Sequence, residues 1–130
     1  MKCFMTSHYL SCTAKGSFED IFQRLSMEFG NVYAKKFGTM GEFLKGIIFG
    51  EQYFFRVSND AALLITLEEV SIGETRLEII ACAAGKGLLG ISYGAHATYV
   101  HNVEDCLRSQ GFSVVPEKEI SYFDRNSPLT

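Results

Sequence analysis

The 130-residue sequence has no excess of positive charge, no long apolar run and no paired-cysteine motif. A helix that spans a bilayer needs about 18 or more consecutive apolar residues, so the sequence predicts no transmembrane segment. The formal net charge of −3 argues against a nucleic-acid partner, because such proteins neutralise phosphates with an excess of Lys and Arg. The first residues lack the apolar core of a signal peptide, so we expect a cytoplasmic protein.

The cysteines show no metal-binding or redox pattern. None forms a C-x-x-C pair or lies at a zinc-ligand spacing from a histidine. We therefore expect reduced, mostly buried thiols. The residues concerned are Cys3, Cys12, Cys82 and Cys106. Cys82 and Cys106 could approach each other between a strand and a helix, but their apolar neighbours predict no nucleophile.

The three histidines show no ligand spacing either. His96 and His101 are five residues apart, which places them about 140° apart around a helix, unlike an i, i+4 pair on one face. We expect His101 to form a surface pair with Asp105. His8 lies in a predicted strand, where we expect a half-buried ring with a local hydrogen-bond partner. The sequence thus predicts no metal site, no cofactor and no catalytic set.

The composition is that of a folded protein with an aromatic core. Tryptophan is absent, but there are eleven Phe and six Tyr, and 47% of all residues are hydrophobic. A chain of this length is one domain by the usual size range and buries roughly two thirds of its unfolded surface. We expect residues 1–125 to form a single domain and residues 126–130 to be a flexible tail.

Two segments have the 3.6-residue period of amphipathic helices. The first is expected between the N-cap Ser17 and Gly30, with a capping interaction between Ser17 and Asp20. The second is expected to begin after Gly94 and to end at Gly111, a residue type suited to a left-handed helix stop.

Alternating residues indicate strands in 2–14, 52–58, 61–70 and 76–84, and a short strand in 113–115 before Pro116. We expect Asn59-Asp60 to form a hairpin turn. Residues 32–50 suggest either a mobile flap or a fixed irregular connection, with a weak helix near 41–45. Together these elements predict a two-layer α+β domain, with one antiparallel sheet of about four or five strands and both helices on one face.

A glycine-rich loop follows the most apolar strand. Gly85-Lys86-Gly87-Leu88-Leu89-Gly90 matches G-x-G-x-x-G, but the dinucleotide fingerprint needs the third glycine at a helix start and an acidic residue after a second strand. Here the predicted helix starts later, and the acids at the right distance lie inside it. We expect a structural loop, or one that binds an anion. The candidate ligand-binding residues are Gly85, Lys86, Gly87, Gly90 and Ser92.

The segment Ser92-Tyr93-Gly94-Ala95 is preceded by a strand and the glycine loop and followed by an amphipathic helix. With these neighbours it resembles a family of short bacterial proteins of unknown function, over roughly residues 60–112. The resemblance implies a bacterial, cytosolic source. It implies no activity, cofactor or site residue.

Two functional hypotheses follow from the sequence. The first is a non-enzymatic binding or interaction module, self-associating as a homodimer through an aromatic sheet face near Phe54 and Arg56, that holds a small apolar or anionic ligand. The second is a small enzyme with a site at the glycine loop. Its residues would be Lys86, Ser92, Tyr93 and His96.

Overall fold

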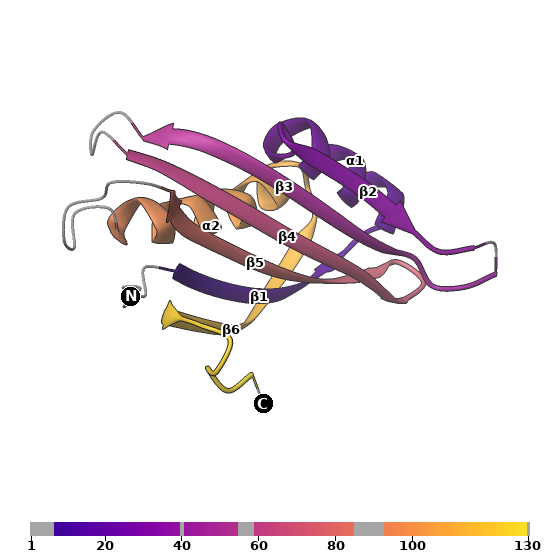
Figure 1. Cartoon of the computed structure of the whole chain (residues 1–130). Helices are drawn as coiled ribbons and strands as arrows, with labels where there is room; N and C mark the ends of the chain where they lie inside the picture. Colours follow the sequence, from indigo (N-terminus) through magenta and orange to yellow (C-terminus); the bar gives the residue numbers. More distant parts are fainter. Residues whose placement is uncertain (1–6, 40, 55–58, 85–92, 130) are drawn as a thin grey trace.

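The computed structural model describes residues 7–39, 41–54, 59–84 and 93–129, with two helices and six strands in these ranges. The strands form one antiparallel sheet in the order β2-β3-β4-β5-β1-β6, and both helices lie on one of its faces (Figure 1). The elements are β1 (Ser7–Lys15), α1 (Phe18–Phe29), β2 (Tyr33–Phe37), β3 (Lys45–Phe54), β4 (Asn59–Ser71), β5 (Glu74–Ala84), α2 (Tyr93–Ser109) and β6 (Ser113–Phe123). The predicted α+β class is confirmed, but the predicted count of four or five strands is wrong.

The extra strand comes from the glycine-containing segment 32–50. It forms β2 and the start of β3, so the predicted helix near 41–45 is wrong. Gly46 and Gly50 are positions of close packing beneath α1: an added Cβ at Gly46 would lie 2.8 Å from the Phe22 ring, and one at Gly50 would lie 1.8 Å from the Phe29 carbonyl oxygen. A sequence reading treats such glycines as breaks, whereas here they let a helix approach the sheet closely.

Two further boundaries differ from prediction. Asn59 does not lie in a turn but begins β4, opposite Phe54 of β3. β6 continues through Pro116 to Phe123, far beyond the predicted residues 113–115. Proline is tolerated because β6 is an edge strand and its register against β1 shifts between Ser11 and Cys12, next to Pro116.

The helix signals read from the sequence are largely confirmed. The Ser17 side chain accepts a hydrogen bond from the Asp20 backbone N–H at 3.1 Å, and Gly30 caps the end of α1. Gly111 has a φ of +92°, and the N–H of the next residue, Phe112, donates to the Leu107 carbonyl in the last turn of α2. Both features are expected for a left-handed helix stop. The start of α2 is the exception, because the helix begins at Tyr93, before Gly94.

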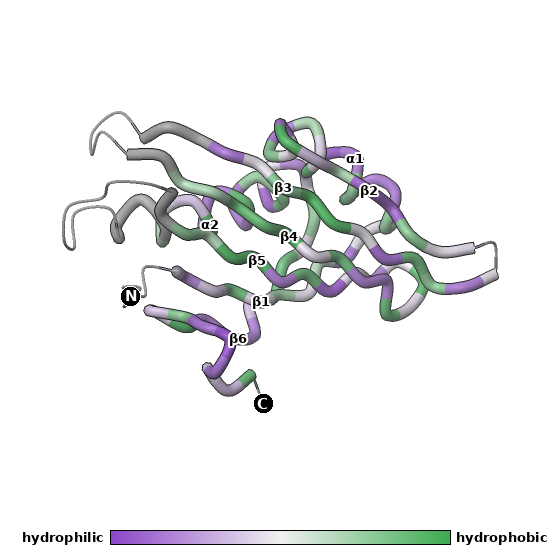
Figure 2. Tube along the Cα trace, in the orientation of Figure 1, coloured by the Kyte–Doolittle hydropathy of each residue, from purple (hydrophilic) through white to green (hydrophobic). Residues whose placement is uncertain are grey.

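The core lies between the helices and one face of the sheet. Apolar residues gather in the middle of β4 and β5, whereas hydrophilic residues are frequent toward the turn that joins them (Figure 2). Alternate residues of these strands, such as Leu63, Ile65 and Ile79, are fully buried against the helices. Each fully buried side chain of this size contributes about 1.5–3 kcal/mol relative to an exposed one. The helical partners are Phe18, Ile21, Phe22, Leu25 and Phe29 of α1 and Tyr99, Val100, Val103 and Leu107 of α2.

The three cysteines that the structure describes are free thiols. Cys12 is buried in the core, whereas Cys82 and Cys106 are only half-buried. Cys82 follows Ala81, which faces the helices, so Cys82 points to the other face and does not approach Cys106 on α2. Cys3 lies outside the described residues.

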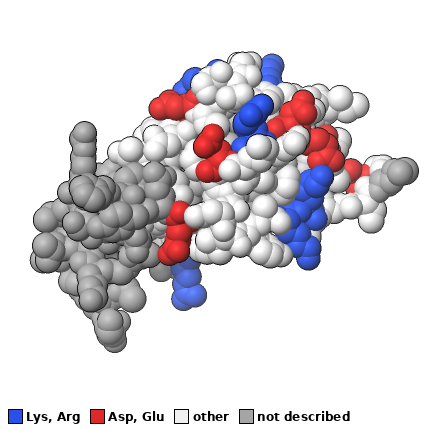
Figure 3. Space-filling model, turned by 90° about the horizontal axis from the view of Figure 1, so that it is seen from above, with Lys and Arg blue, Asp and Glu red and all other residues white. Residues whose placement is uncertain are grey.

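The described surface carries charges of both signs. Lys and Arg side chains are interspersed with Asp and Glu on the face seen in Figure 3. No helix among the described residues is long and apolar enough to cross a membrane.

The contact between Gly50 and α1 can be tested by substitution. We expect Gly50→Ala to lower the free energy of unfolding by about 3 kcal/mol, because the new Cβ would overlap the Phe29 carbonyl and push α1 away from the sheet. Gly41→Ala is the matched control: its Cβ would meet nothing within 4 Å, and only the φ of +91° would be strained, at a cost of about 1 kcal/mol. Urea unfolding measures both, and equal effects would contradict the proposed packing.

Candidate functional site

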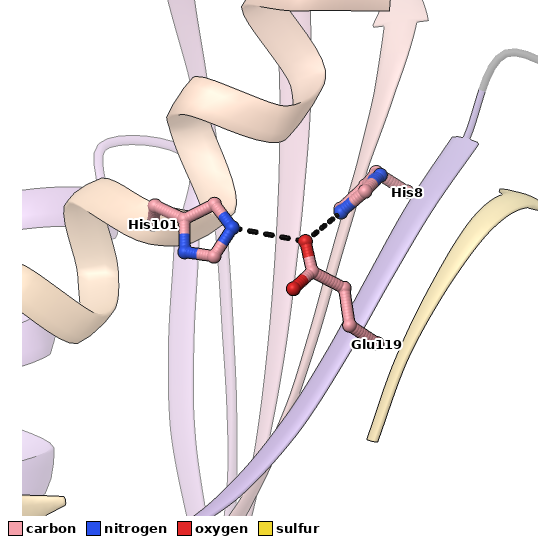
Figure 4. Close-up of side chains that lie close together, drawn as sticks. All are labelled: His8, His101 and Glu119. Atoms are coloured by element: carbon pink, nitrogen blue, oxygen red, sulfur yellow. Dashed lines mark hydrogen bonds and ion pairs between the residues drawn. The ribbon is translucent and has the colours of Figure 1, made fainter. Parts of the chain in front are cut away.

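Three polar residues from distant parts of the chain meet on the helix-bearing side of the sheet, near its β6 edge. His8 lies on β1, His101 on α2 and Glu119 on β6, and their side chains point toward one another (Figure 4). The topology explains the meeting: β1 pairs with β6, and Glu119 lies opposite Leu10, whose side chain shares the core-facing side of β1 with His8. The second helix packs over both strands.

One carboxylate oxygen joins the two imidazole rings. Glu119 Oε2 lies 2.5 Å from His8 Nε2 and 2.9 Å from His101 Nε2. The ring centroids are 6.3 Å apart. His8 is only 3% exposed, whereas the side chains of His101 and Glu119 are 43% and 40% exposed. The cluster therefore has a buried wall on β1 and a side open to solvent.

A second carboxylate extends the cluster along α2. His101 Nδ1 lies 3.1 Å from Glu104 Oε1, and Arg108 Nη1 lies 2.6 Å from Glu104 Oε2. Arg108 also donates from Nη2 to the Val114 carbonyl at 3.0 Å. These contacts make a continuous chain of polar groups from β1 through Glu119 and α2 to the start of β6.

The electrostatics of the cluster favour charged groups. Burial lowers the pKa of His101, but hydrogen bonds to Glu104 and Glu119 outweigh this effect and hold the pKa above its ordinary value. Burial raises the pKa of Glu119, but hydrogen bonds to His8 and His101 outweigh it and the pKa lies below its ordinary value. With carboxylates at both ring nitrogens, His101 can donate two hydrogen bonds as an imidazolium.

The same three groups form a plausible metal-ligand set. His8, His101 and Glu119 each offer one ligand atom, and these atoms all lie within 4.8 Å of one another. Zinc bonds of about 2.0–2.1 Å in a tetrahedral arrangement place neighbouring ligand atoms about 3.3 Å apart. The observed contacts of 2.5 and 2.9 Å are shorter, so binding of an ion would require the Glu119 carboxylate to move outward. The open side of the cluster gives that carboxylate room to move.

The cluster could not be read from the sequence, and two expectations about its residues are wrong. His8 is only 3% exposed, so the expected half-buried ring is wrong, and Glu119, which its Nε2 contacts, is 111 residues away. The expected local partner of His8 stays a prediction. His101 pairs with Glu104, one turn along the helix, and not with the exposed Asp105 as expected. The i, i+3 spacing of His101 and Glu104 was the only local signal, because the other contacts depend on how β1 and β6 pair.

The ligand-binding candidates from the glycine loop lie outside the described residues. These are Gly85, Lys86, Gly87, Gly90 and Ser92. Tyr93 and His96 belong to α2, but their side chains are also outside the described set. The loop hypothesis and the enzyme hypothesis built on it therefore remain predictions.

A separate cleft of about 570 Å³ lies between the end of α1 and α2, and none of the three clustered residues lines it. Glu28, Tyr99 and Cys106 contribute to its walls. Burial raises the pKa of the Cys106 thiol, with Glu28 adding to the effect. A thiol whose pKa is raised in this way is a poor nucleophile.

The charged cluster should leave a signature in the pH dependence of stability. The raised pKa of His101 stabilises the fold below the ordinary histidine value of 6.5, and this contribution is lost as the pH rises through the folded-state pKa. The lowered pKa of Glu119 stabilises the fold above its ordinary value of 4.5, and this contribution is lost as the pH falls through the folded-state pKa. The stabilisation is therefore greatest between pH 4.5 and pH 6.5.

We expect His101→Gln to destabilise the chelator-treated protein more at pH 5.5 than at pH 8.5. We expect the loss of unfolding free energy at the two pH values to differ by less than about 1 kcal/mol, because the His101 ring is partly exposed and screened by water. Urea unfolding at both pH values measures it. Asp105→Asn is the control, since it alters an exposed neighbour on α2 outside the cluster. A destabilisation by His101→Gln that does not vary with pH would contradict the assigned contacts.

A scan against protein-family models gave no match, and a search of curated proteins gave none either. Neither result tests the resemblance noted for Ser92-Tyr93-Gly94-Ala95, which stays a prediction. The chemistry of His8, His101 and Glu119 is therefore the basis for a proposed function.

Proposed function

We propose that the protein is a binding module for a divalent transition-metal ion, held by His8, His101 and Glu119. The observation that carries this proposal is that the three ligand atoms, from three separate elements, lie within 4.8 Å of one another. Two imidazoles and one carboxylate are a donor set suited to zinc and its neighbours among the transition metals. Magnesium and calcium prefer oxygen ligands, so the two nitrogens argue against them.

Three protein ligands leave a coordination position for water or another small ligand. Because His101 and Glu119 are partly exposed, this position would face solvent. A metal ion at this site would attract an anion to the open position, which fits the hypothesis of a module that holds a small anionic ligand. An enzymatic function different from the one predicted at the glycine loop would use this position, since a metal-bound water is the nucleophile of many hydrolytic zinc sites.

Metal binding can be measured directly. Zinc titrated into chelator-treated protein should bind with one ion per chain, and His8→Gln or Glu119→Gln should weaken binding about 100-fold, equivalent to about 2.7 kcal/mol. Competition with a chromophoric chelator gives the dissociation constants.

The matched control for this titration is Glu117→Gln. Glu117 belongs to the same strand as Glu119, but it contacts Thr13 and Arg76, outside the cluster. This variant should bind zinc as the wild type does. Wild-type protein that takes up no zinc, or a Glu117→Gln loss equal to that of Glu119→Gln, would rule out the site.

The second candidate function is self-association through the sheet face that bears no helix. A transverse row of large side chains crosses five strands there, each directly opposite the next. The row is Phe49, Leu64, Ile80, Tyr9 and Ile120. Phe49, Leu64 and Ile80 are half-buried although neither of the two helices that the structure describes covers them. A contiguous apolar strip of this kind is typical of a surface that packs on a partner, and a second copy is the simplest one.

The row beside this strip is polar and internally bonded. Glu78 accepts hydrogen bonds from the Tyr9 hydroxyl at 2.7 Å and from the Thr66 hydroxyl at 3.2 Å. Burial, together with the bond to Glu78, raises the pKa of Tyr9 to about 12, so the phenol stays a donor. This arrangement supports a polar margin to an apolar interface. The side chains of Phe54 and Arg56, which the sequence placed on this face, lie outside the described residues.

A charge placed in the centre of the apolar row tests self-association. We expect wild-type protein to run at twice the chain mass in light scattering, and Leu64→Asp to run as a folded monomer because a desolvated carboxylate opposes packing. Val70→Asp, at the exposed end of the same strand, should remain dimeric. A monomeric wild type at micromolar concentration would contradict the interface.

We also propose a cytoplasmic location. The free thiols of Cys12, Cys82 and Cys106 support it, because reduced cysteines are usual in that compartment. Labelling of these thiols in freshly lysed cells, compared with labelling after reduction, would show whether they are reduced in the cell.

A further inference from the structure

Glu104 touches the one ring nitrogen of His101 that Glu119 does not. Its Oε1 lies 3.1 Å from His101 Nδ1, whereas Glu119 Oε2 lies 2.9 Å from Nε2 on the other side of the ring. We propose that Glu104 is a positioning residue for the metal site: it fixes the His101 tautomer that directs the Nε2 lone pair at the ion. The inference rests on the proposed metal-binding function.

The chemistry of imidazole makes this contact decisive. A neutral ring carries its proton on one nitrogen and a lone pair on the other, and the partner of the protonated nitrogen decides which is which. A carboxylate at Nδ1 accepts a hydrogen bond and so retains the proton there. When the Glu119 carboxylate moves outward to admit an ion and Nε2 gives up its proton, the lone pair on Nε2 would point at the metal position. A carboxylate on the outer nitrogen also makes the ring a stronger metal ligand.

Glu104 is itself held in place from its other oxygen. Arg108 Nη1 lies 2.6 Å from Oε2, and the same guanidinium donates to the Val114 carbonyl at 3.0 Å. The i, i+3 and i, i+4 spacings put His101, Glu104 and Arg108 on one side of α2. The Glu104 side chain is only 8% exposed. A buried carboxylate with a partner at each oxygen has one orientation available, as a positioning role requires.

The Arg108 contact also links the two elements that bring ligands from the C-terminal half of the chain. Val114 is the second residue of β6, and five residues later the same strand supplies Glu119. Arg108 therefore fastens α2, with His101, to the strand that carries Glu119. Removing the Glu104 carboxylate frees one guanidinium nitrogen of Arg108 but leaves its bond to the Val114 carbonyl intact. A substitution that removes the charge of Glu104 therefore keeps the connection between α2 and β6.

The competing explanation is that Glu104 only stabilises α2 through its ion pair with Arg108. Such a pair stabilises a helix whichever His101 nitrogen holds a proton. A structural role would therefore change the unfolding midpoint but leave the imidazole tautomer and the zinc affinity of the folded protein unchanged.

Glu104→Gln separates these explanations, because the amide keeps the size of the side chain and removes its charge. We expect zinc affinity to fall about 10- to 100-fold, the range seen when outer partners of ligating histidines are changed. Asp105→Asn is the matched control, since it removes the same charge from the next residue of α2, which is exposed. It should change the affinity less than about 2-fold, as a surface charge does in water.

The tautomer is read independently of any variant by nitrogen NMR of the imidazole rings in the wild-type protein. The zinc-bound protein should show a protonated Nδ1 and a metal-bound Nε2 on His101. Zinc bound through Nδ1, or an unchanged zinc affinity in folded Glu104→Gln, would overturn the positioning role while leaving metal binding established. Wild-type protein that takes up no zinc would instead overturn the proposed function itself, so the two failures are distinct.

Discussion

The position of β1 inside the sheet is the constraint on which the rest of the structure depends. The first strand of the chain pairs antiparallel with β5 on one side and with β6, the last strand, on the other. Its inward residues Leu10 and Cys12 belong to the core, and His8 on the same side supplies one wall of the polar cluster. Both the core and the cluster thus require the two ends of the described chain to lie side by side.

Burial and polarity are balanced differently at the two ends of β1. Toward Lys15 the core-facing residues are small and apolar, such as Ala14, and they pack below the helices. Toward Ser7 the strand buries an imidazole, and a buried polar ring is tolerated only when it is hydrogen-bonded. Glu119 meets that need from the edge strand. Because one carboxylate oxygen serves two rings, the buried His8 and the half-exposed His101 depend on the same acidic side chain.

Local signals in the sequence identified what local interactions determine. The Ser17 cap, the apolar stripe of α1 and the Gly111 stop of α2 could all be predicted. The start of β3 could not, because Gly46 and Gly50 look like breaks until α1 is packed on them. The length of β6 could not be predicted, because Pro116 reads as the end of a strand and is tolerated here only by the edge position of β6 and its register shift. The cluster was missed for the same reason: 111 residues separate His8 from Glu119, and no spacing rule reaches across a strand pairing that the sequence does not reveal.

The late arrival of Glu119 has a kinetic consequence. Pairing of β1 with β6 is the longest-range contact in the described fold, and contacts between distant parts of a chain form slowly because a large loop must close first. During synthesis, β1 has no neighbour on one side until β6 has emerged, and an unpaired strand edge invites association with other chains. The polar cluster is completed when β6 pairs with β1. A fully formed cluster is therefore a sign that β1 has paired on both sides.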